Sequence, residues 1–490
     1  MLEIHIVNSR LETLSGTREE IYELIKTNNT YFTPFIPHKL ECLTNLLEIK
    51  NSTFDHFFYS NNILCGVSEE EFNKKKLPKY KKDIIGEGGF GKIIRFGKQS
   101  VVIKSMKVNS NPYIREISLN IHVNRVLDLL KERRCVSHIL ETFFYKNYIY
   151  LFFKFYREDT SGIINVFKDI SLALYISEIA GITHNDIKPT NILYDGNNNI
   201  LCDWGLAMWK DLIFSSYQHL QTCSHRAPEI CKGENSSYKS DVFSLGIMVY
   251  EYYKDYSYSN DSNAEILNYY NQIFGENLNL DEIPKKFRLI VKKCLDFDPN
   301  KRPSYAQLSG KEQKDIHFKL SLYKKFPIST LDKSVLQYKK KLINWARDHT
   351  LSFEAILLGS CFFDSYFTEN KLKNESFLFY KKYFAYMLSI STQLLDDENE
   401  VTPKFISKVF GLCVSHINVD ISKICDYFKY DFCLLNPCLI IKNLYINSYE
   451  ISKKRLLRFV YKDNRYDSYR IANWAIGGID KEVEEYYETK

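Results

Sequence analysis

The sequence predicts an α+β chain in which an antiparallel sheet precedes a mostly helical remainder. Residues with β-strand patterning run from Ile84 to Lys104 and are interrupted by glycines, which is typical of strands joined by tight turns. Between residues 342 and 447, apolar side chains recur at three- and four-residue spacing, beginning with Phe353 and Ile356, and this spacing is typical of helices. A chain of 490 residues is long enough for two or three domains.

The composition is that of an ordinary globular protein. Its 66 basic and 60 acidic residues give a net charge of only +6, so we expect no nucleic-acid partner. The twelve cysteines form no C-x-x-C pair, which favours reduced thiols over a zinc site or a disulfide framework. The first residues are too polar for a signal peptide and no apolar run is long enough to span a bilayer, so we expect no membrane partner and a soluble, intracellular protein of the cytoplasm or nucleus. Frequent Lys, Asn, Ile and Tyr are typical of an AT-rich genome, such as that of a large DNA virus.

Two lysine-rich stretches mark the expected domain boundaries. The first contains Pro78 and is typical of a solvated linker, although a basic patch for a membrane or an acidic partner is the alternative there. The second contains Pro327 and marks the second boundary. The predicted organisation is an N-terminal extension of unassigned role (1–80), a first domain (81–310), a basic linker (311–341), a helical domain (342–447) and a C-terminal tail (448–490).

A glycine-rich run follows the apolar pair Ile84 and Ile85. Gly86, Gly88 and Gly91 form a G-x-G-x-x-G pattern, in which missing side chains allow backbone N–H groups to approach phosphates. The pattern alone also fits a plain turn or a dinucleotide-binding loop. A dinucleotide-binding loop opens into a helix, whereas strand patterning continues here, so we reject that alternative.

A lysine and a glutamate follow as a candidate pair. Lys104 ends an apolar strand, where a lysine is costly unless it has an anionic partner, and we expect that partner to be a phosphate. Glu116, on the next predicted helix, is expected to fix Lys104, although a surface glutamate is the simpler alternative when it is considered alone.

The strongest motif runs from His184 to Asn191. Asp186 is expected to accept or orient the proton of a substrate hydroxyl, and Lys188 to neutralise the charge of a phosphoryl group in transfer. Asn191 and Asp203, the latter in an Asp-Trp-Gly sequence, supply oxygen ligands for a magnesium ion. The simpler alternative is a polar loop followed by a turn without a catalytic role, but it does not account for four such motifs in this order.

Two further residue sets predict supporting contacts. Glu229, in an Arg-Ala-Pro-Glu sequence, is expected to form a buried ion pair with Arg302. Asp241 is expected to accept backbone N–H groups of the loop that contains Asp186.

From Ile84 to Pro303 these motifs resemble a eukaryotic-type serine/threonine protein kinase. The resemblance implies a bilobal fold, in which an N-terminal antiparallel sheet with one helix precedes an α-helical lobe and ATP binds between the lobes. It implies ATP and Mg²⁺ as cofactors, with Mn²⁺ as a substitute, and a protein substrate; Lys188 favours serine or threonine over tyrosine as acceptor. Lys154 to Tyr156 correspond to the hinge. The residues expected to contact ATP are Ile85, Gly86, Gly88, Gly91, Ile93, Val102, Lys104, Phe153, Phe155 and Leu193.

The helix sequence from Ile114 to Leu119 resembles that of cyclin-dependent kinases in particular. The region 342–447 is similar to a cyclin box: residues 342–345, 353–367 and 377–395 resemble its first helices, and residues 430–432 followed by Pro437 resemble its final helix. The resemblance implies an intramolecular cyclin-like partner that activates the kinase in cis. An unrelated helical bundle is the alternative.

The sequence also departs from the kinase pattern. Asn185 and Met208 replace two arginines that would clamp a phosphorylated activation loop, which leaves Arg115, so a phosphate at the aligned Tyr217 would find little compensating charge. Two alternatives remain for the whole chain, a scaffolding pseudokinase and a small-molecule kinase of related fold. The first would lose Lys104, Asp186 or Asp203, and none is lost.

Overall fold

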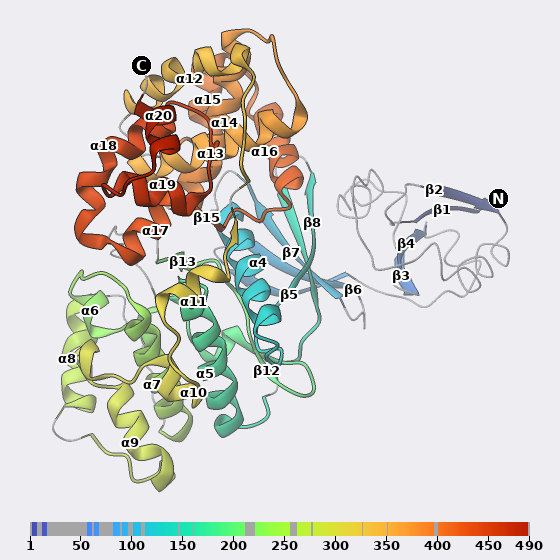
Figure 1. The fold of residues 1–490 in the computed structure, drawn as a ribbon. Coiled ribbons are helices and arrows are strands. Elements are labelled where there is room, and N and C mark those ends of the chain that lie inside the picture. The colour runs from blue at the N-terminus through green and yellow to red at the C-terminus, as the bar shows by residue number, and fades with distance from the viewer. Residues whose placement is uncertain are drawn as a thin grey trace. The chain divides into compact units, whose positions relative to one another are not determined.

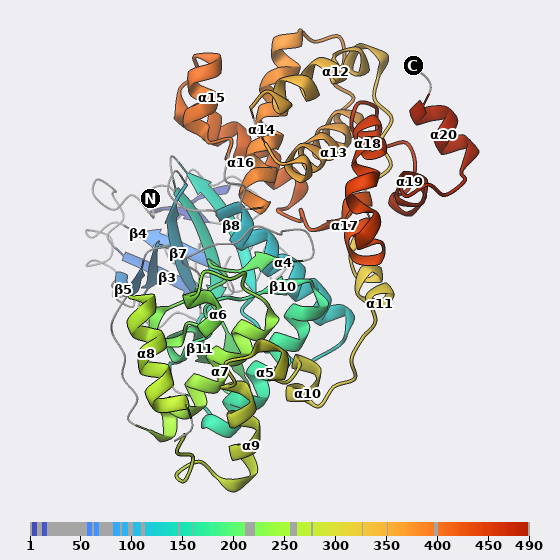
Figure 2. The same cartoon turned by 90° about the vertical axis from the view of Figure 1, so that its left-hand side faces the viewer.

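The computed structural model describes two compact units, Met1–Asn111 with His138–Phe155, and Pro112–Ser137 with Tyr156–Lys490 (Figures 1 and 2). The described residues are 2–6, 12–16, 56–60, 63–67, 82–88, 91–96, 101–108, 113–145, 148–158, 160–210, 221–254, 262–275, 278–325, 327–349, 351–395 and 400–488. Most of the predicted extension 1–80, and the lysine-rich stretch at its end, therefore lie outside them. No helix in the described part of the chain is long and apolar enough to cross a membrane.

The first unit contains two antiparallel sheets. The larger sheet has the strand order β5-β6-β7-β9-β8 and comprises β5 (Lys82–Gly88), β6 (Gly91–Phe96), β7 (Val101–Lys107), β8 (Ile139–Tyr145) and β9 (Tyr148–Lys154). The smaller sheet has the order β2-β1-β4-β3 and comprises β1 (Leu2–Ile6), β2 (Glu12–Gly16), β3 (His56–Ser60) and β4 (Ile63–Val67). The predicted antiparallel sheet is confirmed in the larger one.

The second unit begins with α4 (Tyr113–Leu129), the helix predicted to follow the sheet, and continues into a helical lobe. The helices of that lobe are α5 (Ile163–Ile179), α6 (Pro228–Cys231), α7 (Tyr238–Tyr253), α8 (Asn263–Phe274), α9 (Lys285–Cys294), α10 (Tyr305–Ser309) and α11 (Ile316–Ser321). Its short strands are β10 (Ile182–Thr183), β11 (Ile192–Tyr194), β12 (Asn199–Leu201) and β13 (Met208–Trp209). Single 3₁₀ turns lie at η1 (Pro189–Asn191), η2 (Cys223–His225) and η3 (Pro299–Lys301).

The rest of the second unit is mostly helical, and the sequence predicts helices for its residues 342–447. Its elements are β14 (Lys324–Lys325), α12 (Lys333–Arg347), α13 (Phe353–Asn370), α14 (Phe377–Leu395), α15 (Pro403–Phe410), α16 (Val414–Phe428), β15 (Leu434–Leu435), α17 (Pro437–Leu444), η4 (Ile446–Ser448), α18 (Tyr449–Val460), α19 (Ser468–Ala475) and α20 (Lys481–Glu488). Helix α14 contacts α12, α13, α15 and α16 and is the central helix of this group.

Close packing of α13 against α14 forms the core of this C-terminal group. A Cβ atom on Gly359 would lie 2.9 Å from a methyl carbon of Leu388, so the glycine allows the two helices to approach. Phe363 packs edge-on against Phe384, with ring centroids 5.5 Å apart. Such aromatic pairs add to the stabilisation that burial itself provides.

The segments 311–341 and 448–490 differ from the predicted linker and tail. Asp332 caps α12, which begins inside the predicted linker. Lys333, Lys340 and Lys341 are exposed on this helix, whereas Lys339 is buried, as are Val335 and Leu342, and forms an ion pair with Asp364. In the predicted tail, α18 packs on α13 and buries Leu456 and Phe459. In both segments long charged side chains cover one face of each helix, and these residues make the helical spacing of the apolar residues hard to recognise in the sequence.

The expected final helix begins at Pro437 and not at residues 430–432. Helix α16 ends at Phe428, Lys429 and Tyr430 have left-handed backbone conformations, and the chain passes through β15 before α17 begins at Pro437. The two left-handed residues end the helix and redirect the chain.

The predicted ion pair between Glu229 and Arg302 forms in the helical lobe. Two guanidinium nitrogens of Arg302 each donate to one carboxylate oxygen of Glu229 at 2.7 Å, and both side chains are buried. Ser240 donates a third hydrogen bond to Glu229 at 2.8 Å. This pair ties the start of α6 to the segment after η3.

We predict that Arg302→Met strongly destabilises the protein, because it leaves the Glu229 carboxylate buried without its cation. Breaking a buried pair in this way costs ~3–5 kcal/mol. The free energy of unfolding, from urea titration followed by fluorescence, measures the effect. Lys453→Met, which removes the exposed pair with Glu450, is the control and should cost less than about 1 kcal/mol. Equal, small effects of the two substitutions would contradict the prediction.

Candidate active site

A buried carboxylate holds the loop between β10 and β11. Asp241, on α7, accepts the backbone N–H groups of His184 and Asn185, each at 2.8 Å, as the sequence predicts. It also accepts the hydroxyl of Tyr305 at 3.2 Å. Burial raises the pKa of Asp241 to about 6, and these donors act against that shift. The loop that carries Asp186 is thus bonded to the core of the helical lobe.

Three side chains meet at the carboxylate of Asp186, which is 5% exposed. Asn191 donates to its Oδ2 atom and to its backbone oxygen, both at 2.8 Å, and Lys188 lies 2.9 Å from the same Oδ2. Thr222 donates its hydroxyl to Oδ1 at 2.6 Å and accepts a hydrogen bond from Lys188 at 2.9 Å. The structure therefore brings together the three residues that the sequence singles out, and Thr222 joins them.

Thr222 is a residue of the site that the sequence does not predict. A lone threonine carries no spacing signal, and its contact with Asp186 spans 36 residues. Its place four residues before Arg226, just ahead of the Arg-Ala-Pro-Glu sequence, is the only hint that the chain offers.

Asp203 directly follows Cys202, whose backbone is hydrogen-bonded to that of Asn191. The backbone N–H of Cys202 donates to Asn191 O at 2.9 Å, so the two expected metal ligands are on adjacent backbone segments. Asp203 has φ 58, a left-handed conformation that is costly for residues other than glycine and is often found at functional sites.

His184 is bonded to backbone atoms on both sides of the site. Its Nδ1 accepts the backbone N–H of Asp186 at 3.3 Å, and its Nε2 lies 3.1 Å from Cys202 O. Burial lowers the pKa of His184, although the nearby carboxylates of Asp186 and Asp203 act to raise it, so we expect a neutral ring. The ring packs edge-on against Trp204, with centroids 4.8 Å apart. The His184 ring therefore joins the backbone at Asp186 to that of Cys202, the residue before Asp203.

The donor set fits a magnesium ion. The amide nitrogen of Asn191 is used by Asp186, so its oxygen is the atom that can face a cation. Asp203 adds a carboxylate, and Mg²⁺ prefers such oxygen ligands while keeping water or phosphate oxygens for its other positions.

The residues expected to contact ATP divide between the two units. Within the larger sheet, Ile93 pairs with Lys104, and Val102 pairs with Phe153. Because paired and alternate residues point to the same face, these four side chains share one face of the sheet. Lys104 is 6% exposed, which is consistent with a lysine that has an anionic ligand.

The other residues of this set are placed as follows. Ile85 is 43% exposed on β5, next to a register shift between Ile84 and Gly86. Phe155 follows β9, with the guanidinium of Arg95 3.3 Å above its ring. Leu193 lies on β11 in the helical unit.

The glycines of the phosphate-binding run have different roles. Gly91 has φ 140, and a Cβ there would lie 2.3 Å from Ser105 O, so only glycine allows β6 and β7 to pair at this point. A Cβ on Gly86 would only touch Ile93, at 3.4 Å. Gly88 ends β5. Gly89 and Phe90 lie outside the described residues.

Asn185 occupies the place of one missing arginine. Its amide nitrogen donates to the hydroxyl of Thr183 and to Leu206 O, each at 3.2 Å, so this short side chain ties the loop to the residues after Asp203. Met208, which replaces the second arginine, is buried on β13. Tyr217, the aligned phosphoacceptor, lies outside the described residues.

Helix α4 carries Glu116 and contacts the C-terminal helices. Glu116 is 3% exposed, and Arg115 is also buried. On the same helix, Arg125 donates to both carboxylate oxygens of Asp431 at 2.6 and 2.8 Å and to Cys433 O at 3.0 Å. Helix α14 packs against both α4 and β13.

Buried groups extend this contact. The Cys433 thiol donates to Ser118 O at 3.8 Å. Burial lowers the pKa of His122, as does the charge of Arg125, so the neutral Nδ1 can accept the Arg125 hydrogen bond at 2.8 Å. Tyr113, at the start of α4, is fully buried near Cys425.

Comparison with known proteins agrees with this geometry. Residues 80–312 match the protein kinase domain family. The chain is 27% identical over 189 residues to protein 040L of Invertebrate iridescent virus 3, which carries a serine/threonine-protein kinase name, and the match covers 37% of this chain and 50% of the relative. It is 28% identical over 191 residues to serine/threonine-protein kinase AtPK1/AtPK6 of Arabidopsis thaliana, which covers 34% of this chain and 40% of the relative. It is 34% identical over 168 residues to dual specificity mitogen-activated protein kinase kinase jkk-1 of Caenorhabditis elegans, which covers 31% and 38%.

The matched part of the chain spans half or less of the length of these relatives. Residues 80–312 are a protein kinase domain, and the names of several relatives support the serine/threonine class.

We predict that Thr222→Val lowers the turnover number for phosphoryl transfer about 10- to 100-fold. A hydrogen bond to a charged group contributes ~1.5–3 kcal/mol, and about 1.4 kcal/mol corresponds to a factor of ten. Valine keeps the shape of threonine but removes the hydroxyl that orients Asp186. Thr222→Ser keeps the hydroxyl and should retain most of the activity. If the valine and serine variants have equal turnover, Thr222 does not act through its hydroxyl.

Proposed function

We propose that this protein is an ATP-dependent serine/threonine protein kinase. The observation that carries the proposal is the arrangement of Asp186, Lys188, Asn191 and Thr222, in which every polar atom around the Asp186 carboxylate holds it in a fixed position. Such positioning is the main contribution a protein makes to phosphoryl transfer.

In the proposed reaction, Asp186 orients the acceptor hydroxyl and accepts its proton. Lys188, which is 25% exposed beside Asp186, neutralises the charge of the transferred phosphoryl group. Asn191 and Asp203 hold a magnesium ion, which when bound neutralises phosphate charge. Lys104 and the glycine run from Gly86 to Gly91 bind the nucleotide phosphates.

The alternatives fit these observations less well. A scaffolding pseudokinase needs no ordered carboxylate, whereas Asp186 and its partners form a complete hydrogen-bonded set. The presence of Lys188 in the loop and the names of the relatives support a protein hydroxyl of serine or threonine as acceptor, although jkk-1 is named a dual-specificity kinase. A small-molecule kinase remains the second alternative.

We predict that Asp203→Asn and Lys104→Met each abolish phosphate incorporation from labelled ATP into a generic basic protein and leave the fold intact. Both residues act on the bound nucleotide and metal, and loss of one charge interaction of ~1.4 kcal/mol already costs tenfold. Asp281→Asn, at a side chain that is 85% exposed, is the matched control and should remain fully active. Activity above about a tenth of wild type in both variants, free of co-purified kinase, would rule out the proposed site.

We further propose a cyclin-dependent-kinase-like regulation, in which the C-terminal helices act as an internal cyclin-like partner. Three observations support it: the sequence of α4 from Ile114 to Leu119, the central position of α14 among its neighbours, and the contacts of α14 and Asp431 with α4. In this proposal the C-terminal helices set the orientation of α4, and thus of Glu116, the expected partner of Lys104.

Covalent attachment strengthens such a contact. A tethered domain acts at an effective concentration near millimolar for a short flexible connection, so a modest intrinsic affinity keeps it docked. A shift from mostly inactive to mostly active needs about 5.5 kcal/mol of differential contact. The buried thiol, tyrosine and arginine contacts on α4 are of the kind that can provide it.

We predict that Arg125→Asp and Asp431→Arg each lower kinase activity at least tenfold, and that the double variant regains a substantial part of it. Each single change places like charges together in a half-buried contact, and the double change restores attraction. Initial rates of the full-length variants measure the effect. Asp128→Arg, which changes the charge of an exposed side chain on the same helix, is the control. Full activity in both single variants would eliminate regulation through this contact and leave the kinase proposal intact.

A further inference from the structure

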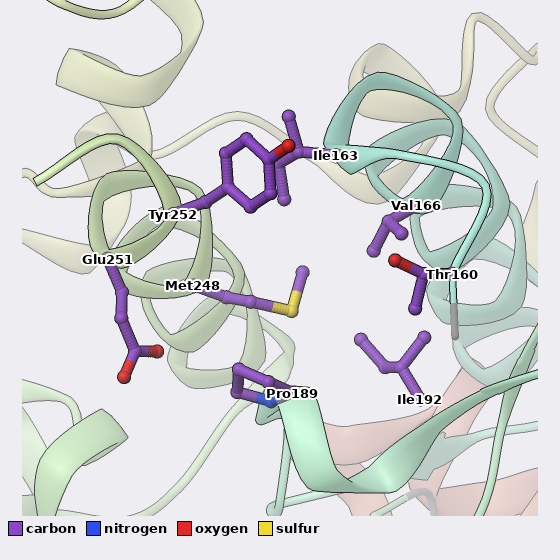
Figure 3. Close-up of a pocket in the computed structure, with 8 residues that line it drawn as sticks. All are labelled: Thr160, Ile163, Val166, Pro189, Ile192, Met248, Glu251 and Tyr252. Carbon is purple, nitrogen blue, oxygen red and sulfur yellow. The ribbon is translucent and has the colours of Figure 1, made fainter. Parts of the chain in front are cut away.

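The helical lobe contains an apolar cavity beside the loop that carries Asp186. The cavity has a volume of about 130 Å³ and lies wholly within the second unit. Figure 3 shows side chains from three parts of the lobe that point into it: Val166 from α5, Met248 from α7 and Ile192 from β11. These three side chains are nearly fully buried, so the walls are fixed by packing.

The mouth of the cavity is open where the walls end. Tyr252, on the last turn of α7, is 61% exposed, and Thr160, in the segment before α5, is exposed with its hydroxyl directed into the cavity. Glu251 also borders the cavity, but its carboxylate turns away and lies 3.1 Å from His225 Nε2. Apart from the Thr160 hydroxyl at the mouth, the lining that an entering group meets is therefore mainly apolar.

The position of the cavity follows from how the chain enters α5. The described residues between Lys154 and Ile163 contain no helix, and the chain passes from β9 to α5 through an extended bridge between Arg157 and Tyr194. Ile163 and Val166, in the first turn of α5, form one wall of the cavity.

The cavity adjoins the catalytic loop directly. Pro189, which forms its floor, is three residues from Asp186, so the two Cα atoms are at most about 11 Å apart. Asn191, which holds Asp186, lies between Pro189 and Ile192, the two lining residues of this segment. A peptide bound with a hydroxyl at Asp186 advances about 3.3 Å per residue. A side chain a few residues from the acceptor can therefore reach the cavity.

We propose that this cavity is a substrate subsite that binds one unbranched or branched aliphatic side chain, of leucine or methionine size, on the protein substrate. The inference rests on the proposed kinase function and adds the class of substrate sequence. An apolar cavity of about 150 Å³ is large enough to take up benzene, so this cavity can take up one such side chain. Specificity arises because an alanine at that position leaves the apolar lining unfilled, whereas an aspartate buries a charge without a partner.

The test uses full-length protein and serine peptides in which each position around the acceptor is varied in turn among leucine, methionine, alanine and aspartate. We expect one position at which leucine or methionine raises kcat/KM about tenfold or more over alanine, mainly through KM. Thr160→Phe, which places a ring at the mouth, should reduce this preference to less than about twofold without changing kcat on the alanine peptide. Leu289→Phe, at an exposed apolar site on α9, is the matched control and should keep the preference.

Tyr252→Ala provides a second test, since it removes an exposed wall residue at little risk to the fold, and it should weaken the preference in the same direction. The absence of any preferred position, or a preference that both Thr160→Phe and Tyr252→Ala retain, would overturn the subsite and leave the kinase proposal standing. Absence of phosphate incorporation by the wild-type protein on every peptide and on a generic basic protein would overturn both.

Discussion

The catalytic arrangement depends on the buried carboxylate of Asp241. Its two bonds to backbone N–H groups are the contacts that join the loop of Asp186 to α7, the central buried helix of the lobe. Asn185 can hold its left-handed backbone, φ 62, only because this anchor determines the course of the loop. The hydrogen bonds from Asn191 and Thr222 then act on a carboxylate whose backbone is already fixed. Because the loop that carries Asp186 is already held in place, the site does not have to become ordered in each reaction cycle.

A buried ion pair between Glu229 and Arg302 also holds the same lobe together. The pair is bidentate, and Ser240 donates a further hydrogen bond to Glu229, so both buried charges are compensated. Thr222 and His225 lie in the segment just before this pair. This buried ion pair therefore fixes the end of the segment from which Thr222 reaches the Asp186 carboxylate.

The sequence predicts those features whose residues follow one another at fixed spacing. Asp186, Lys188 and Asn191 lie within one loop, so their spacing already constrains their geometry, and the structure confirms that they meet. Contacts made by distant single residues carry no such constraint. Thr222 reaches Asp186 across 36 residues, and Arg125 meets Asp431 across 306 residues. The helices after residue 448 were missed because charged residues dominate their outer faces. The cavity beside Pro189 was missed because its lining comes from separate parts of the chain.

The long separation between Arg125 and Asp431 has a consequence for how the protein is made. Helix α4 is buried on nearly every side, and part of its cover leaves the ribosome only after about 300 further residues. At roughly 5–20 residues per second, this is a delay of roughly 15–60 s, far longer than a helix or hairpin needs to form. During that time the α4 surface that packs against Cys433 and α14 is without its cover, and an apolar surface in that condition attracts other nascent chains and chaperones. The production of this protein in a foreign host is therefore limited by the speed and protection of its synthesis, in addition to the stability of the finished fold.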